Sequence, residues 1–301
     1  MLSPEMDSRW PVSDLNRPAR RVRSNEPTNA PRLTPHDADR NALGLQLPLR
    51  YQLVDALERR ELQVHYQPKF SLATGALQGI EALLRWKTRS GVWIAPSAFV
   101  PVLEETGMID EVGRWLFERA AVDAQYWRSQ GLSPVRIAIN VSPLQLRGNG
   151  FLSWVLANRG TWKALDTGLD IELTESSLLT DSREVVEAMN ALAAAHIHLA
   201  LDDFGTGYSS LDLLMRLPVR HLKIDRSFVA RMSTSPKALA VVEAIIRMGR
   251  QVGIGTIAEG VERLEQLNQL RALGCDVAQG HYFSPALARE ELACRLKSHR
   301  T

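Results

Sequence analysis

Short apolar stretches alternate with longer amphipathic stretches along the chain from about residue 48 onward. The apolar stretches have the length of strands, and most of the others carry apolar residues at helical spacing. Alternation of this kind predicts a parallel sheet, and roughly eight strands favour an α/β fold, a TIM-like (β/α)8 barrel, over the alternative of a doubly wound open sheet. The predicted strands are 62–70, 77–86, 135–142, 169–175, 197–204, 221–225, 254–260 and 277–283, and the predicted helices are 110–130, 182–195, 209–217, 235–252 and 262–273.

Two of the predicted helices show which face they bury. In 262–273, leucines recur at every third position, and Gly274 follows as a C-cap. In 235–252, we expect Ala244, Ile245 and Met248 to face the barrel.

The first 47 residues have a different composition. Seven of the fifteen prolines fall in the first 50 residues, among Asn, Ser and Arg. Such a segment buries too little apolar surface to offset the entropy of ordering, so residues 1–47 are predicted to be a disordered tail. Its arginine cluster "RPARRVR" is a solvated tail in the simplest interpretation, and a contact with anionic lipid or a protein partner is the alternative.

Charge and cysteine content narrow the class of protein. A formal net charge of +2 gives no reason to expect a nucleic-acid polymer as a partner. Cys275 and Cys294 are the two cysteines, and they show neither a disulfide framework nor metal-ligand spacing. The N-terminus does not resemble a signal peptide, and no apolar run is long enough for a membrane span, so we expect a cytoplasmic protein.

Nearly every predicted strand ends in a carboxylate, a carboxamide or an amine. Each of these groups alone has a structural explanation, such as capping the next helix. In a (β/α)8 barrel, however, the carboxyl ends of the strands meet at one rim, which is where such barrels place their active sites. The residues concerned are Glu81, Asn140, Glu172, Glu175, Asp202, Asp203, Lys223, Asp225, Glu259, Glu262 and Gln279.

This set of donors points to metal chemistry. Oxygen ligands without cysteine or paired histidine favour hard divalent cations, Mg²⁺ or Mn²⁺. The adjacent acids Asp202 and Asp203 would repel each other unless a positive charge lay between them, and they are predicted to hold two metals close together. Paired hard metals most often serve phosphoryl chemistry. Lys223 suits a group that orients a water, and Arg85 could clamp a phosphate.

The chain resembles the EAL-domain family, the cyclic di-GMP-specific phosphodiesterases of bacterial second-messenger signalling. Glu81-Ala82-Leu83 is the signature triplet, and further phrases follow in the family's order. They are "EALLRW", "FVPVLEETGMI", "INVSPLQL", "IELTES", "LDDFGTGYSSL", "LPVRHLKIDRSFV", "IAEGVE" and "GCDVAQG". The resemblance implies an EAL domain over 48–299, a barrel whose first strand is antiparallel to the others, and metal-dependent hydrolysis of cyclic di-GMP to linear pGpG.

The resemblance also implies a role for each site residue. The metal ligands would be Glu81, Asn140, Glu172, Asp202, Asp203 and Glu259, and the catalytic residues Lys223, Glu259, Asp202, Glu175 and Gln279. Gln67, Leu84 and Arg85 would contact the substrate, with Glu262 and Asp225 in support. A gating loop tethered by Glu175 would comprise Asp203, Phe204, Gly205, Thr206, Gly207, Tyr208, Ser209 and Ser210.

Other functions stay open from the sequence. One is a non-catalytic receptor or adaptor that binds cyclic di-GMP and a protein partner; the complete set of acids argues against it. Composition and spacing by themselves also allow a barrel hydrolase of some other phosphodiester. Relatives suggest a homodimer. The ending "QGHYFSPAL" departs from the usual family pattern, which leaves the last strand and loop less certain.

Overall fold

The computed structural model of the chain describes residues 49–57, 59–147, 149–164, 168–175, 183–207 and 211–297. The tail predicted over 1–47 lies outside these residues, as do Tyr208, Ser209 and Ser210 of the predicted gating loop. Among the described residues, no helix has both the length and the apolar character that crossing a bilayer requires.

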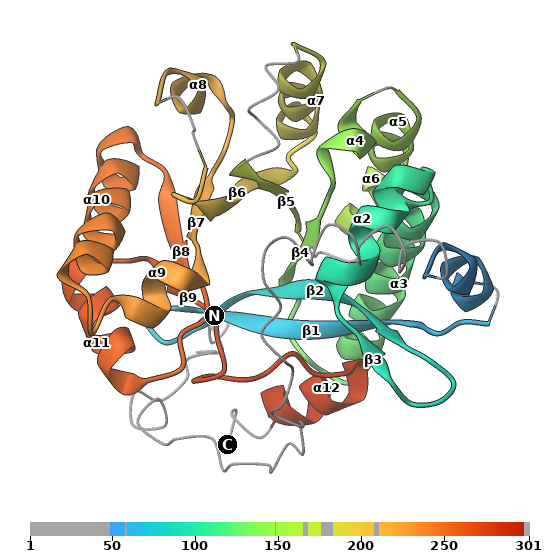
Figure 1. The fold of residues 1–301 in the computed structure, drawn as a ribbon, viewed down its shortest axis with the longest axis horizontal. Coiled ribbons are helices and arrows are strands. Elements are labelled where there is room, and N and C mark those ends of the chain that lie inside the picture. The colour runs from blue at the N-terminus through green and yellow to red at the C-terminus, as the bar shows by residue number, and fades with distance from the viewer. Residues whose placement is uncertain are drawn as a thin grey trace, which may run out of the picture.

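Eight of the described strands close into a barrel with helices around it, which confirms the predicted fold class (Figure 1). Around the barrel the order is β1-β9-β8-β7-β6-β5-β4-β2, and the pairing of β1 with β2 closes it. A short strand, β3 (Trp93–Ile94), extends β2 in a hairpin outside the barrel. The barrel strands are β1 (Leu62–Ser71), β2 (Leu77–Lys87), β4 (Arg136–Asn140), β5 (Leu169–Thr174), β6 (His198–Phe204), β7 (His221–Ile224), β8 (Gly255–Ala258) and β9 (Val277–Ala278).

The first strand runs against the others, as the family resemblance implies. β1 is antiparallel to both β2 and β9, whereas the remaining neighbours around the barrel are parallel. In the β1–β2 pair, Gln67 lies opposite Glu81, and Lys69 lies opposite Gly79. The carboxyl ends of β2 and β4–β9 therefore form one rim, and on β1 Gln67 lies nearer to that rim than Lys69.

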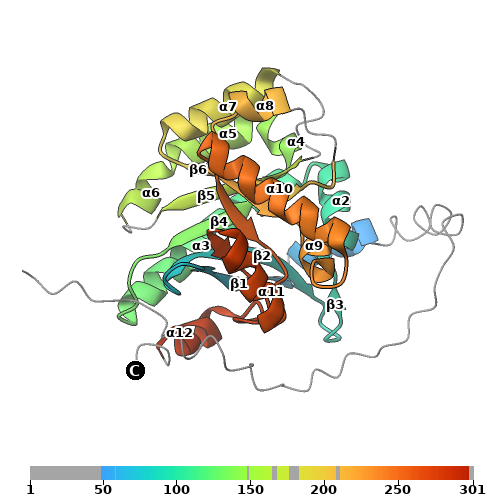
Figure 2. The same ribbon diagram turned by 90° about the vertical axis from the view of Figure 1, so that its left-hand side faces the viewer.

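Helices cover the outside of the barrel, with α9, α10 and α11 in front of the strands in Figure 2. α12 packs against β1. A further helix over 49–57 precedes β1. The others are α2 (Pro96–Thr106), α3 (Ile109–Ser129), α4 (Pro143–Leu146), α5 (Asn149–Ala157), α6 (Arg159–Ala164), α7 (Arg183–Ala194), α8 (Leu211–Arg216), α9 (Arg226–Arg231), α10 (Pro236–Val252), α11 (Leu264–Leu273) and α12 (Arg289–Lys297).

α10 shows why the sequence forms these helices where it does. Ser235 caps the first turn by accepting a hydrogen bond from the backbone N–H of Ala238, and Gly253 ends the helix in the left-handed conformation. The buried side comprises Ala238, Val242, Ile245, Ile246 and Gly249. Ala244 is exposed, so its predicted position facing the barrel is wrong, because Val242 and Ile246 define a stripe that leaves position 244 on the outer side.

The last strand ends earlier than predicted. β9 spans only 277–278 instead of 277–283, because the chain turns at Gly280, where φ is 157°. A Cβ at Gly280 would lie 2.2 Å from the carbonyl oxygen of Val261. This turn lets the backbone of Val261 bond both Gln279 and Tyr282, which fixes Gln279 at the rim.

Candidate metal centre and active site

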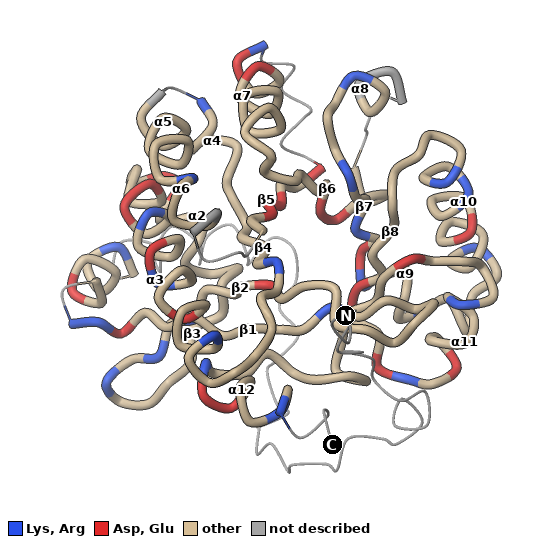
Figure 3. Tube along the Cα trace, turned by 180° about the vertical axis from the view of Figure 1, so that it is seen from behind, with Lys and Arg blue, Asp and Glu red and all other residues tan. Residues whose placement is uncertain are grey.

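Acidic side chains from several strands gather at the middle of the barrel. Figure 3 shows acidic positions on β2, β5 and β6 around this point. Glu81, Glu172 and Asp202 are buried, with exposures of 4%, 1% and 9%, while Glu259 after β8 is half-buried and Asp203 is exposed. Burying this many carboxylates is costly unless positive charge compensates them.

The ammonium group of Lys223 lies at the centre of these acids. Its Nζ is 2.5 Å from Glu172 Oε2, 2.7 Å from Glu259 Oε1 and 2.8 Å from Asp202 Oδ2. Glu81 Oε1 is 3.6 Å away, and the lysine itself is wholly buried. The positive charge of Lys223 thus lies close to four acids, which are carried by β2, β5, β6 and the residue that follows β8.

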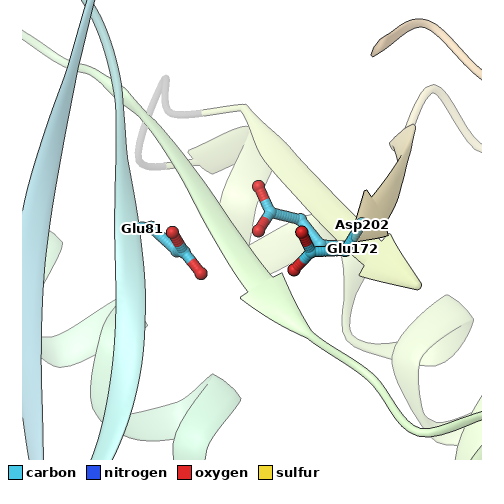
Figure 4. A group of neighbouring side chains, drawn as sticks. All are labelled: Glu81, Glu172 and Asp202. Atoms are coloured by element: carbon cyan, nitrogen blue, oxygen red, sulfur yellow. The ribbon is translucent and has the colours of Figure 1, made fainter. Parts of the chain in front are cut away.

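The acids form two groups that share one member. Glu81, Glu172 and Asp202 each offer an oxygen within 4.8 Å of the others, and so do Asp202, Asp203 and Glu259. Figure 4 shows the first group, in which three carboxylates from β2, β5 and β6 lie near one another. The arrangement can hold two divalent cations through all-oxygen ligands, with Asp202 between them.

A β-bulge explains how two adjacent aspartates both join this centre. In a regular strand, Asp202 and Asp203 would point to opposite faces. The register between β6 and β7 shifts between Leu201 and Phe204, and Asp203 has a φ of 55°. The extra residue turns the chain so that Asp203 reaches the second group.

Two carboxamides fix the orientation of Glu81. Asn140 Nδ2 donates to Glu81 Oε1 over 2.7 Å, and Gln279 Nε2 donates to Glu81 Oε2 over 2.6 Å. Gln279 also donates to Gln67 Oε1 over 2.9 Å, and Gln67 donates to the carbonyl oxygen of Ser284. Gln279 Oε1 is buried without a hydrogen-bond partner among the described residues, which fits an acceptor for a ligand or for a water bound to one.

Burial and the neighbouring charges shift the pKa values of the acids away from those of free carboxylic acids. Burial raises the pKa of Glu172 to about 7 and that of Glu259 to about 8, although Lys223 opposes both shifts. Burial, followed by the neighbouring Asp202, raises the pKa of Asp203 to about 6. Burial also disfavours ionisation of Glu81, but Lys223, Lys69 and the two carboxamides outweigh it and hold the pKa at about 2. Glu172, Glu259 and Asp203 therefore release their protons less readily than free carboxylic acids, and bound divalent cations would take the place of those protons.

The loop after β6 is tied to the buried acid Glu175. Glu175 Oε2 accepts hydrogen bonds from the backbone N–H groups of Gly205 over 2.7 Å and of Gly207 over 3.3 Å. Thr206 Oγ1 donates to the carbonyl oxygen of Asp203. The described part of the predicted gating loop is thus anchored at its start by Glu175.

The predicted substrate contacts lie beside the acids. Arg85 is half-buried, and its Nη1 donates to the carbonyl oxygen of Leu84 over 3.0 Å. Burial lowers the pKa of Arg85. Leu84 and Arg85 line a cavity of about 240 Å³ together with Asn140 and Glu172. A ligand held by the acids could therefore extend into this cavity.

The two residues predicted to support the site differ in position. Asp225 lies next to Asp203, where it helps to raise the pKa of that acid, and it caps α9 by accepting a hydrogen bond from Ser227. Glu262 is exposed and belongs to neither group of acids. Its supporting role stays a prediction.

Lys69 is a site residue that the sequence analysis missed. It is buried, and its Nζ forms an ion pair with Glu172 Oε1. A signal was present in the strand pattern, because Gln67 and Lys69 are two residues apart on β1 and so share a face. If Gln67 faces the barrel interior, Lys69 must also do so.

A sequence-family model and several known proteins match most of the chain. The sequence model described as "EAL domain" matches residues 50–286. The oxygen sensor protein DosP of Escherichia coli is 38% identical over 247 residues, which make up 82% of this chain and 31% of DosP. The bifunctional diguanylate cyclase/cyclic di-GMP phosphodiesterase MucR of Pseudomonas aeruginosa is 37% identical over 82% of this chain and 36% of MucR. The chain spans about a third of the length of these relatives.

Solved structures give the same result. The phosphodiesterase of MucR, in complex with c-di-GMP, aligns with a TM-score of 0.75 at 37% identity, covering 81% of this chain and 99% of that one. The EAL domain of Mycobacterium smegmatis DcpA aligns with a TM-score of 0.64 at 32% identity, covering 79% and 97%.

Proposed function

The chain belongs to the EAL domain family, and on that premise we propose that it hydrolyses cyclic di-GMP to linear pGpG in a reaction that requires Mg²⁺ or Mn²⁺. The observation that carries the proposal is the clustering of acids at the rim of the barrel. They form two groups of three, and Asp202 belongs to both. One relative supports the substrate in two ways, since MucR is named a bifunctional diguanylate cyclase/cyclic di-GMP phosphodiesterase and its phosphodiesterase was solved in complex with c-di-GMP.

The residues present fit a centre of two divalent cations. Carboxylate oxygens and the amide oxygen of Asn140 are ligands that Mg²⁺ and Mn²⁺ prefer. The ligands would be Glu81, Asn140, Glu172, Asp202, Asp203 and Glu259. Cations held there would polarise the phosphodiester and make a water more acidic.

The chain's own side chains would then orient the reactants. Lys223 contacts members of both groups of acids, and with cations bound to those acids its Nζ would hold the attacking water. Gln279 Oε1, which is buried without a partner, would accept a hydrogen bond from the same water. Arg85 would pair with a phosphate, and Leu84 and Gln67 would contact the rest of the dinucleotide. In the reaction water adds to phosphorus, one P–O bond breaks, and the 3′ oxygen that leaves receives a proton.

The test is to incubate the purified full chain with cyclic di-GMP and to separate the products by chromatography. We expect pGpG with Mg²⁺ or Mn²⁺ and none with a chelator. Tight binding of cyclic di-GMP without turnover under both metals would favour the receptor function. Hydrolysis of other cyclic nucleotides at a comparable rate would indicate a less specific phosphodiesterase, and neither binding nor turnover would refute the proposal. A homodimer and a protein partner for the tail stay predictions.

A further inference from the structure

Glu172 has its two carboxylate oxygens divided between two lysines. Lys223 contacts Oε2, and Lys69 contacts Oε1. Glu172 is 1% exposed and Lys69 is 5% exposed, so water does not replace either contact. A carboxylate held at one oxygen keeps a fixed rotation about its terminal bond, and the other oxygen then points in a fixed direction.

Lys69 approaches Glu172 from within the barrel, on the side away from the rim. On β1 it lies two residues beyond Gln67, and its partner in the register is Gly79, two residues before Glu81 on β2. Lys223, in contrast, contacts members of both groups of acids. The two lysines therefore act at different places. Among the described residues, Lys69 pairs with Glu172 and has no ion pair with Asp202 or Glu259, whereas Lys223 pairs with all three acids.

We propose that Lys69 is a positioning residue that holds Glu172 Oε1 from inside the barrel and thereby presents Oε2 to the cation position formed by Glu81, Glu172 and Asp202. The inference rests on the proposed metal centre and assigns a role within it. The proposed role of Lys69 concerns one of the two cation positions, because Lys69 has no ion pair with Asp203 or Glu259 among the described residues.

Coulomb attraction alone predicts the opposite effect of removing Lys69. Losing a positive charge close to a cation site would strengthen cation binding. Losing a group that orients a ligand typically weakens metal binding by about 10- to 100-fold. The sign of the change in metal affinity therefore separates a positioning role from a role in charge balance.

The experiment compares Lys69→Met with Lys237→Met in the full chain. Lys237 is exposed on α10, so its replacement changes the net charge equally without touching the acids. Mn²⁺ binding is measured by calorimetry without substrate, and bound Mn²⁺ by electron paramagnetic resonance. We expect Lys69→Met to raise the dissociation constant of one of the two Mn²⁺ ions by about tenfold or more and to alter the resonance spectrum of that ion. Lys237→Met should bind Mn²⁺ with the affinity and the spectrum of the wild-type chain. Unchanged or tighter Mn²⁺ binding in Lys69→Met overturns the inference.

Double variants locate the effect. Lys69→Met should add little to the loss in Mn²⁺ affinity caused by Glu172→Gln, and should add its full effect to that of Asp203→Asn, because only Glu172 is its partner. If Lys69→Met reduced the Mn²⁺ affinity by the same factor in the Glu172→Gln chain and in the Asp203→Asn chain, the proposal would be contradicted. If Lys69→Met does not fold by circular dichroism, Lys69→Leu takes its place, since it also removes the N–H donor, and the same two outcomes apply.

The outcome is independent of the proposed catalysis. A wild-type chain that binds Mn²⁺ but does not cleave cyclic di-GMP would refute the proposed function, and the comparison of Lys69 variants would still decide the inference. A wild-type chain that binds no Mn²⁺ would overturn both.

Discussion

Glu81 is the acid at the centre whose surroundings most favour ionisation, since its pKa is about 2 while that of Glu172 is about 7. We expect Glu81→Ala to lower kcat/KM for cyclic di-GMP by at least ~10³-fold, equivalent to ~4 kcal/mol of transition-state stabilisation, because a ligand in the first group is lost. The measurement is product formation at saturating Mn²⁺.

The same substitution removes one hydrogen-bond acceptor from the amide of Asn140 and one from the amide of Gln279, which keeps only Gln67 Oε1, and this costs ~1–3 kcal/mol of stability. Circular dichroism should therefore show a folded protein with a lower melting temperature. Near-normal turnover in the folded variant would remove Glu81 from the set of metal ligands.

At the scale of single residues, the sequence predicted the rim acids but not Lys69. Glu172 and Asp202 lie near the carboxyl ends of apolar strands and Glu81 lies within one, and the strand pattern marks these positions without any knowledge of contacts. Lys69 lies within β1, and its inward direction depends on how β1 pairs with β2. The convergence of Asp203 with Asp202 depends on a bulge, which the sequence pattern does not reveal.

At the scale of elements, the carboxylate of Glu175 anchors the segment after β6 through two backbone hydrogen bonds. We expect Glu175→Ala to free the backbone N–H groups of Gly205 and Gly207, to speed their hydrogen exchange, and to reduce turnover by about tenfold or more, because Asp203 at the start of the segment loses its fixed position. Hydrogen exchange by mass spectrometry over 203–207 and product assays measure the two effects.

The matched control for this prediction is Glu187→Ala. Glu187 is an exposed acid on α7 whose partner is Arg183 in the same helix. It should leave both exchange and turnover unchanged. Slow exchange over 203–207 in Glu175→Ala would show that other contacts hold the segment.

The predicted elements follow the apolar pattern, and the missed ones interrupt it. The bounds of β1, β2, β6 and α10 differ from the prediction by one residue at most at either end. α2 was not predicted, because Pro101 within it breaks the usual helical signal. β9 is shorter than predicted because apolar content does not reveal the turn that Gly280 makes against Val261.

At the scale of the whole molecule, periodicity predicted a barrel but not the direction of its first strand. A strand carries the same alternation in either direction, so the antiparallel β1 came from the family resemblance alone. The direction matters for function, because it brings Gln67 and Lys69 to the centre from a strand whose carboxyl end lies away from the rim.

The buried acids also couple the stability of the whole barrel to pH and to cations. Burial raises the pKa of Glu172 to about 7 and that of Glu259 to about 8, against an ordinary value of 4.5. A carboxyl whose pKa is raised in the folded state stabilises the fold at pH values below the unfolded pKa, and that contribution is lost as pH rises through the folded pKa. We therefore expect the melting temperature in a chelator to fall from about pH 5 to about pH 8 and to level off above that.

Divalent cations should reverse this loss, because they bind the ionised carboxylates of the folded state. Mn²⁺ at about 100 times its dissociation constant would add ~2.7 kcal/mol, and the gain should be larger at pH 8 than at pH 6 as the acids release their protons. Calorimetric melting with Mn²⁺ or chelator at each pH measures both trends. In the variant Glu172→Gln/Glu259→Gln the fall in chelator should flatten, which separates these two acids from all other titrating groups. A melting temperature in chelator that rises across this range, or a fall equally steep in the double variant, would show that these acids do not hold their protons in the folded barrel.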